Sequence, residues 1–155
     1  MNFAESRWVS VSPELMRGPQ PQEEDLRDLM AVGLGGVVNL RLESEHSREL
    51  CQQLGLRYHY FPVRDWTCPE QRQIEEFLSL FEESPSGPLL VHCMGGVGRT
   101  GVFVSCYRVA RGMDPGQAIR LSHTEVSWMS MNDEQMQFVV AFGRWWAERQ
   151  QERNR

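Results

Sequence analysis

Short apolar segments alternate along the chain with longer segments whose apolar residues recur every three to four positions. Short apolar runs and alternating aromatic stretches are typical of strands, and they are found at residues 7–12, 35–40, 56–61 and 88–92. The 3.6-residue spacing predicts helices over residues 19–33, about 44–54, 67–81 and 100–112, then a short helix from 115 and a last one from about 132. Strands that alternate with helices predict an α/β fold: a central, mostly parallel, twisted sheet of about 4–5 strands flanked by helices.

Local signals indicate where several of these helices begin and end. Gly55 is expected to end the second helix in the left-handed conformation. Thr67 and Glu70 have the spacing of a capping box, and Asp114 before Pro115 suits a helix start. The last helix is expected to pack through Met136, Val139, Val140 and Trp146, with Gln135 near its beginning.

The length of 155 residues suits one domain, with a core over about 8–146 and a charged tail over 147–155. The composition, 41% hydrophobic and 24% charged, is that of an ordinary globular protein. The net charge of −5 argues against a general nucleic-acid or anionic-membrane binder, so we expect no nucleic-acid partner. We also expect a monomer.

The chain begins without a basic segment followed by an apolar run, and it contains no apolar stretch of about 20 residues. We therefore expect neither a secretory signal nor membrane insertion. The four cysteines show no C-x-x-C pair and no zinc-type spacing. A cytoplasmic protein with reduced thiols and no metal site is the simplest interpretation.

The segment HCMGGVGRT, residues 92–100, joins the last predicted strand to an apolar helix. A strand, a glycine-rich turn and a helix N-terminus form an anion site, because backbone N–H groups and the helix dipole both favour negative charge. Cys93 at the base of this loop would be stabilised as a nucleophilic thiolate. The residues expected to bind the substrate phosphate are Met94, Gly95, Gly96, Val97, Gly98 and Arg99.

Each polar residue of the loop has an expected role. Arg99 can grip two phosphate oxygens with its guanidinium fork. Thr100 would place a hydroxyl near the sulfur and stabilise it as a leaving thiolate, and His92 would fix the loop by hydrogen bonds instead of acting as a base. This set suits phosphoryl transfer through a cysteinyl-phosphate, for which no cofactor is implied.

Other interpretations of the loop are weaker. A buried cysteine in a glycine-rich turn can be purely structural, but the whole register is hard to obtain by chance. A Walker-type loop is excluded because there is no Gly-Lys-Ser/Thr. A zinc site at His92 and Cys93 is disfavoured because no second pair of ligands has suitable spacing.

The sequence HCMGGVGRTG resembles the signature of the cysteine-based protein tyrosine phosphatase superfamily, in which His-Cys is followed by five residues, Arg, and Ser or Thr. RGPQP near the front and VVNLR in the first buried strand are similar to the small atypical dual-specificity branch. The likeness extends from about Trp8 to Trp145. It implies a phosphatase fold and a phosphorylated protein or peptide as substrate.

Hydrolysis of a phosphate ester by a thiolate also needs a proton for the departing oxygen. Asp65, in the segment PVRDW, follows a predicted strand and so lies at the same sheet edge as Cys93. The family carries its general acid on a movable loop at about this place. Trp66 is expected to shield the carboxyl group from water. The alternative is that Asp65 is an ordinary turn residue.

Weaker candidates surround these residues. Family geometry suggests Arg17 and Arg41 for the pocket rim, although such an arginine is more often just a surface cation. Arg64, beside the acid, is as readily a solvated charge as a contact for an anionic substrate. Gln135 matches a glutamine of this branch but also suits a helix start. Stricter tyrosine phosphatases carry a catalytic glutamine where this chain has Met131. Cys68 suits a plain loop thiol better than a redox partner of Cys93.

Three function classes remain open from the sequence. The first is a phosphatase with dual specificity and a phosphotyrosine preference; a phosphoinositide substrate is disfavoured because Met94 and Val97 stand where lipid-directed relatives carry lysines. The second is a phosphate-binding pseudophosphatase, and the third is a rhodanese-like sulfurtransferase.

Overall fold

The computed structural model describes residues 7–83, 86–126 and 130–154. In these ranges one mixed sheet contains five strands in the order β1-β2-β5-β3-β4. The strands are β1 (Val9–Ser12), β2 (Leu15–Gly18), β3 (Gly36–Arg41), β4 (Arg57–Val63) and β5 (Leu89–His92). Only β1 runs antiparallel to its neighbour, so the predicted α/β fold with a mostly parallel sheet is confirmed.

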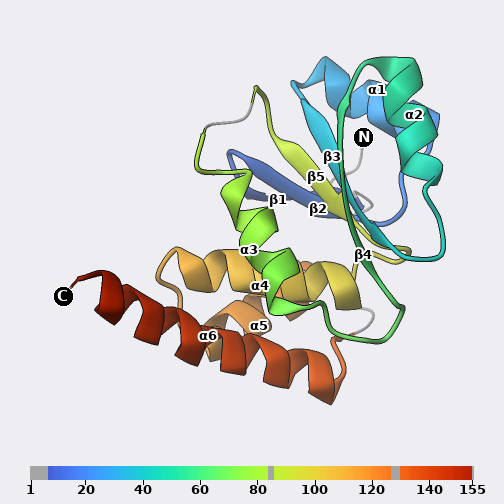
Figure 1. The fold of residues 1–155 in the computed structure, drawn as a ribbon. Helices are drawn as coiled ribbons and strands as arrows, with labels where there is room; N and C mark the ends of the chain where they lie inside the picture. The colour runs from blue at the N-terminus through green and yellow to red at the C-terminus, as the bar shows by residue number, and fades with distance from the viewer. Residues whose placement is uncertain (1–6, 84–85, 127–129, 155) are drawn as a thin grey trace.

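Helices cover both faces of this sheet (Figure 1). The first face carries α1 (Glu23–Ala31) and α2 (His46–Leu54), and the second carries α3 (Gln71–Ser79), α4 (Gly98–Ala110), α5 (Pro115–Glu125) and α6 (Asp133–Arg153). Because β5 lies in the middle of the sheet, the loop that follows it begins near the centre of the domain.

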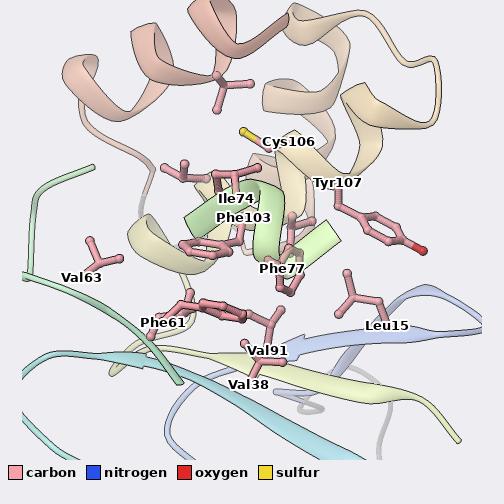
Figure 2. Close-up of a cluster of buried hydrophobic side chains, with 14 of the residues drawn as sticks. Leu15, Val38, Phe61, Val63, Ile74, Phe77, Val91, Phe103, Cys106 and Tyr107 are labelled. Atoms are coloured by element: carbon pink, nitrogen blue, oxygen red, sulfur yellow. The ribbon is translucent and has the colours of Figure 1, made fainter. Parts of the chain in front are cut away.

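Alternation along the central strands divides the core into two clusters. Val37 and Leu90 face α1 and α2, whereas Val38 and Val91 face the helices on the other side. Figure 2 shows the larger cluster, in which Phe61, Phe77 and Phe103 join the sheet to α3 and α4. Strands buried on both faces explain why the sequence shows apolar runs there.

Helix α4 is buried over most of its length, from Arg99 to Val109. A helix that is apolar all round belongs in the centre of a domain. It packs against α5 and α6 on one side and the sheet on the other. This burial fixes the direction of its first turn, and therefore the position of the loop that precedes it.

Strand β2 is absent from the predicted elements. Its sequence, LMRG, has only two apolar residues and a charged one, so no periodicity reveals it. The strand is nevertheless inserted between β1 and β5, where Leu15 and Arg17 are both buried. Tertiary contacts, described below, override the local preference of arginine for the surface.

Several helix ends also differ from the predictions. Gly55 has the expected left-handed conformation with φ of 76°. The capping box of α3, however, is formed by Glu70 and Gln73, so the prediction for Thr67 and Glu70 is wrong. The side chain of Thr67 instead bonds back to the carbonyl of Arg64 in a tight turn.

The last helix follows the predicted start, and of the four residues predicted to pack, Met136, Val139 and Trp146 do so. Its cap is Asn132, with Gln135 at the third position. Val139 and Phe142 are buried, whereas Val140 is exposed, because it lies a full 100° around the helix from Val139. The helix continues to Arg153, so most of the expected tail is helical; Arg155 lies outside the described residues.

Candidate active site

A pocket of about 210 Å³ lies at the carboxyl end of β5. Ligands bind at this edge of parallel sheets. The pocket is lined by Asp65, Trp66, Cys93, Met94, Gly95, Val97, Gly98, Arg99, Ser130 and Gln135. The structure therefore brings together Cys93, Arg99 and Asp65, the three residues to which the sequence analysis assigns the chemistry, although Asp65 and Arg99 are 34 positions apart in the sequence.

The loop after β5 curls around the Cys93 sulfur. The N–H of Gly96 donates to Sγ of Cys93 at 3.2 Å, a contact that favours the thiolate. Gly96 has φ of +77°, and a Cβ there would lie 2.6 Å from the carbonyl carbon of Gly18. Only glycine can therefore occupy this position, because both the conformation and the space exclude a side chain.

His92 fixes the start of the loop from within the core. Its Nδ1–H donates to the carbonyl of Cys93 at 2.9 Å, so Nε2 accepts from the hydroxyl of Ser47. Burial, together with the charges of Arg41 and Arg99, lowers the pKa of His92 to about 4. Both ring nitrogens are engaged in hydrogen bonds, so the imidazole fixes the orientation of the loop, and its lowered pKa makes it a weak base.

This burial makes His92 a source of acid sensitivity. Its pKa falls from about 6.5 in the unfolded chain to about 4 in the fold, so the stability it confers is complete above pH 6.5 and lost as the pH falls to 4. We expect the loss to be on the order of a few kcal/mol. Replacing His92→Asn, which keeps an N–H donor but does not titrate, should flatten the pH dependence of the free energy of unfolding measured in urea between pH 7 and 4. Parallel curves for the two proteins would contradict this assignment.

Arg99 is held by a carboxylate that the sequence analysis did not single out. Nη1 and Nη2 of Arg99 donate to the two carboxylate oxygens of Glu43 at 2.7 and 3.1 Å, and Nη1 also donates to the carbonyl of Val63 at 2.9 Å. The hydrogen bonds from Arg99, with smaller contributions from a backbone N–H and from Arg41, lower the pKa of Glu43 to about 2, so its carboxylate stays ionised. Burial alone would lower the pKa of Arg99, but Glu43, Cys93 and Asp65 together raise it above its usual value. Glu43 thus fixes the fork of Arg99 in one orientation.

Two buried polar atoms beside the sulfur have no hydrogen-bond partner within the described part of the chain. They are Nε of Arg99 and the hydroxyl of Thr100 in the first turn of α4. Buried donors ordinarily find an acceptor. An anion in the loop would supply one to the guanidinium, whereas the hydroxyl of Thr100 makes no hydrogen bond to the Cys93 sulfur in this structure, contrary to expectation. These donors fit a bound phosphate.

Asp65 lies in a turn between β4 and α3 that is under backbone strain. Trp66 has φ of 68°, which is rare for a bulky side chain, and its N–H donates to Oδ1 of Asp65 at 3.0 Å. That oxygen also lies 3.5 Å from Nη2 of Arg99. The Asp65 and Trp66 side chains are each 58% exposed, so Trp66 does not shield the acid in this structure, contrary to expectation.

The first turn of α6 holds this strained turn in place. Nδ2 of Asn132 donates to the carbonyl of Trp66 at 2.9 Å, and Nε2 of Gln135 donates to that of Thr67 at 3.2 Å. The side chain of Gln135 also lies next to Gly98, so it connects the turn at Asp65 to the loop after β5. Its Oε1 accepts from the N–H of Asn132 and so caps α6 at the same time. Met131 is buried against Gly101 and is not a pocket residue.

The remaining candidates lie away from the pocket. Arg17 is buried beneath the loop, so its prediction as a rim residue is wrong. Arg41 is half-buried and bonds Glu43 and Gln20. Arg64 is exposed beside the acid without lining the pocket. The thiol of Cys68 donates to the carbonyl of Glu134, and burial raises its pKa. Cys68 also does not line the pocket.

The family described as Swiss Army Knife protein, DSP-PTPase phosphatase domain, matches residues 4–143. Dual specificity protein phosphatase 26 of Rattus norvegicus is 31% identical over 116 residues, 68% of this chain and 51% of that protein. The protein of Arabidopsis thaliana named phosphatidylinositol 3,4,5-trisphosphate 3-phosphatase and protein-tyrosine-phosphatase PTEN1 is 30% identical over 125 residues, 78% of this chain and 29% of its own length.

The crystal structure of Tk-PTP in the active form has the same fold, with a TM-score of 0.79 and 24% identity over 90% of this chain and 98% of that one. The chain spans about half or less of the length of the two curated relatives named above. No helix within residues 7–83, 86–126 and 130–154 is long and apolar enough to cross a membrane.

Proposed function

We propose that this chain, which belongs to the DSP-PTPase phosphatase family, hydrolyses phosphate monoesters of proteins through a cysteinyl-phosphate on Cys93, with dual specificity and a preference for phosphotyrosine. The observation that carries the proposal is the convergence of a thiol, a fixed guanidinium and a carboxyl group in one pocket. Each supplies one of the three needs of the reaction: a nucleophile, a binder of the phosphoryl oxygens and a proton donor.

In the first step the thiolate of Cys93 attacks the phosphorus. A P–S bond forms, the ester P–O bond breaks, and the departing oxygen takes the proton of Asp65. The loop N–H groups and Arg99 stabilise the charge on the three phosphoryl oxygens. Glu43 supports this step because it holds the guanidinium at the orientation that leaves Nε free for the substrate.

In the second step water attacks the phosphorus of the cysteinyl-phosphate. Asp65, now ionised, takes a proton from that water, the P–S bond breaks, and inorganic phosphate and the thiolate are released. The hydroxyl of Thr100 would stabilise the sulfur as it leaves. The chemistry needs no metal, because the loop, the guanidinium and the acid provide all the charges.

The pocket mouth supports an aromatic phosphate ester. Trp66 and Met94 are 58% and 56% exposed while lining the pocket, so both offer apolar surface to a substrate ring. An aryl phosphate also has a good leaving group. Phosphoserine and phosphothreonine would enter the pocket with fewer contacts to Trp66 and Met94. They would therefore be hydrolysed, but less efficiently than phosphotyrosine.

A phosphoinositide is the second candidate, because one relative carries that substrate in its name. Several phosphates on one ring require several cations at the mouth. The sequence contains no lysine, and Arg99 is the one cation among the described residues that line the pocket. This charge pattern favours a single phosphate.

Steady-state hydrolysis of a panel tests the proposal, with Cys93→Ser as the control. The panel holds para-nitrophenyl phosphate, peptides with phosphotyrosine, phosphoserine or phosphothreonine, and a phosphoinositide. We expect kcat/KM to be highest for the phosphotyrosine peptide among the biological substrates. A higher kcat/KM for the phosphoinositide would make a lipid the substrate instead of a protein. Binding of phosphopeptide without turnover would indicate a pseudophosphatase. Turnover of thiosulfate but of no phosphate ester would indicate a sulfurtransferase.

A further inference from the structure

Arg17 lies beneath the phosphate loop, on the side away from the pocket. It is 1% exposed. Its Nη2 donates to the carbonyl of Gly96 at 2.9 Å, while Nη1 donates to the hydroxyl of Ser122 at 2.7 Å and to Glu125 at 3.1 Å. One guanidinium therefore connects helix α5 to the loop through the short strand β2.

The buried charges around Arg17 do not balance. Glu125 also accepts from both terminal nitrogens of Arg108 at 2.7 Å, so two guanidinium groups share one carboxylate. A buried charge without a partner is costly. Burial lowers the pKa of Arg17, and Glu125 and the sulfur of Cys93 oppose that effect. Within the loop, the thiolate of Cys93 is the anion that can balance the extra positive charge.

The segment after Arg17 holds a second carbonyl of the loop. The backbone N–H of Gln20 donates to the carbonyl of Met94 at 2.9 Å. All described peptide bonds are trans, and in a trans peptide the C=O and the next N–H point in opposite directions. Drawing the carbonyls of Met94 and Gly96 outward therefore turns the N–H groups of Gly95 and Val97 inward, toward the phosphate.

We propose that Arg17 is a positioning residue of the phosphate site, which orients the Gly96–Val97 peptide and whose buried charge favours the Cys93 thiolate. This inference rests on the proposed function for its catalytic consequence. Its two parts can be separated, because a lysine keeps the charge but cannot bond Gly96 and Glu125 at once as the guanidinium fork does.

The test uses Arg17→Met, Arg17→Lys and the matched control Arg108→Met, all in a Cys68→Ser background, because Cys68 is more exposed than Cys93 and would also react. Arg108→Met takes a charge from the same Glu125 but leaves the loop contact intact. Three quantities are measured: the pH midpoint of Cys93 alkylation by iodoacetamide, protection of Cys93 by inorganic phosphate, and kcat and KM for para-nitrophenyl phosphate.

We expect Arg17→Met to raise the alkylation midpoint by about one pH unit and to weaken phosphate protection about tenfold. Arg17→Lys should keep the midpoint but still weaken protection. Arg108→Met, which removes the same unit of charge without touching the loop, should raise the midpoint but keep the protection. Equal loss of phosphate protection in Arg17→Met and Arg108→Met would show a merely structural role and overturn the inference. If Arg17→Met does not fold, the inference is overturned when phosphate protects Cys93 in Arg17→Lys as well as in the wild-type protein.

The outcomes also separate this inference from the proposed function. Alkylation and phosphate protection require no turnover. If the wild-type protein hydrolyses no ester but phosphate protects its Cys93, and Arg17→Met loses that protection, the phosphatase is refuted and the positioning role of Arg17 stands. Full turnover with Arg17→Met and unchanged protection would do the reverse.

Discussion

Cys93→Ser abolishes turnover of every phosphate ester in our account while leaving phosphate binding nearly intact. A hydroxyl has far too high a pKa to ionise in the loop, whereas the Gly96 N–H, Arg99 and the other phosphate donors are unchanged. We expect kcat to fall by about 10⁵-fold or more, the scale seen when an enzyme loses its nucleophile. Steady-state kinetics measure the loss, and calorimetric titration with inorganic phosphate measures the binding that remains.

Cys68→Ser is the matched control for this substitution. It removes a thiol outside the pocket that donates to the carbonyl of Glu134. Its kcat/KM should stay within about twofold of wild type, in line with the small effect of a surface substitution. Residual turnover in Cys93→Ser above a few per cent would refute the cysteine mechanism, even if Cys68→Ser were fully active.

Asp65→Asn is expected to lower kcat by about 10²–10⁴-fold for a phosphotyrosine peptide, the usual contribution of general acid catalysis. The amide cannot donate the proton that the leaving oxygen needs. The first step with para-nitrophenyl phosphate should be much less affected, because its leaving group needs little protonation. Rapid-mixing measurements of the first turnover with both substrates give the comparison.

The control for the acid is Asp28→Asn, an exposed carboxylate on α1, far from the pocket. It should leave both substrates unaffected. If Asp65→Asn slowed neither substrate, or slowed both first steps equally, Asp65 would not be the acid.

The phosphate loop could be predicted from the sequence because its residues are contiguous. His92, Cys93 and Arg99 lie within eight positions, in a register that resembles the phosphatase signature. The place of Asp65 in the pocket could be predicted because β4 and β5 run parallel, which brings their carboxyl ends to one edge of the sheet.

Arg17 and Glu43 could not be assigned in the same way. Nothing in LMRG distinguishes a buried arginine from a surface one, since its burial depends on Ser122 and Glu125 more than 100 residues later. Glu43 follows β3 at the correct edge, but acids at that place commonly begin a helix. Its bidentate contact with Arg99 is a property of the packed structure alone.

The central claim is tested most directly by isolating the covalent intermediate. Asp65→Asn is mixed rapidly with para-nitrophenyl phosphate, because this variant should form the intermediate readily but hydrolyse it slowly. The reaction is quenched, and the peptide that contains Cys93 is analysed by mass spectrometry. Our account predicts one phosphoryl group on the Cys93 sulfur, formed as fast as para-nitrophenol is released. Release of para-nitrophenol without a phosphoryl group on Cys93 at any time would contradict it.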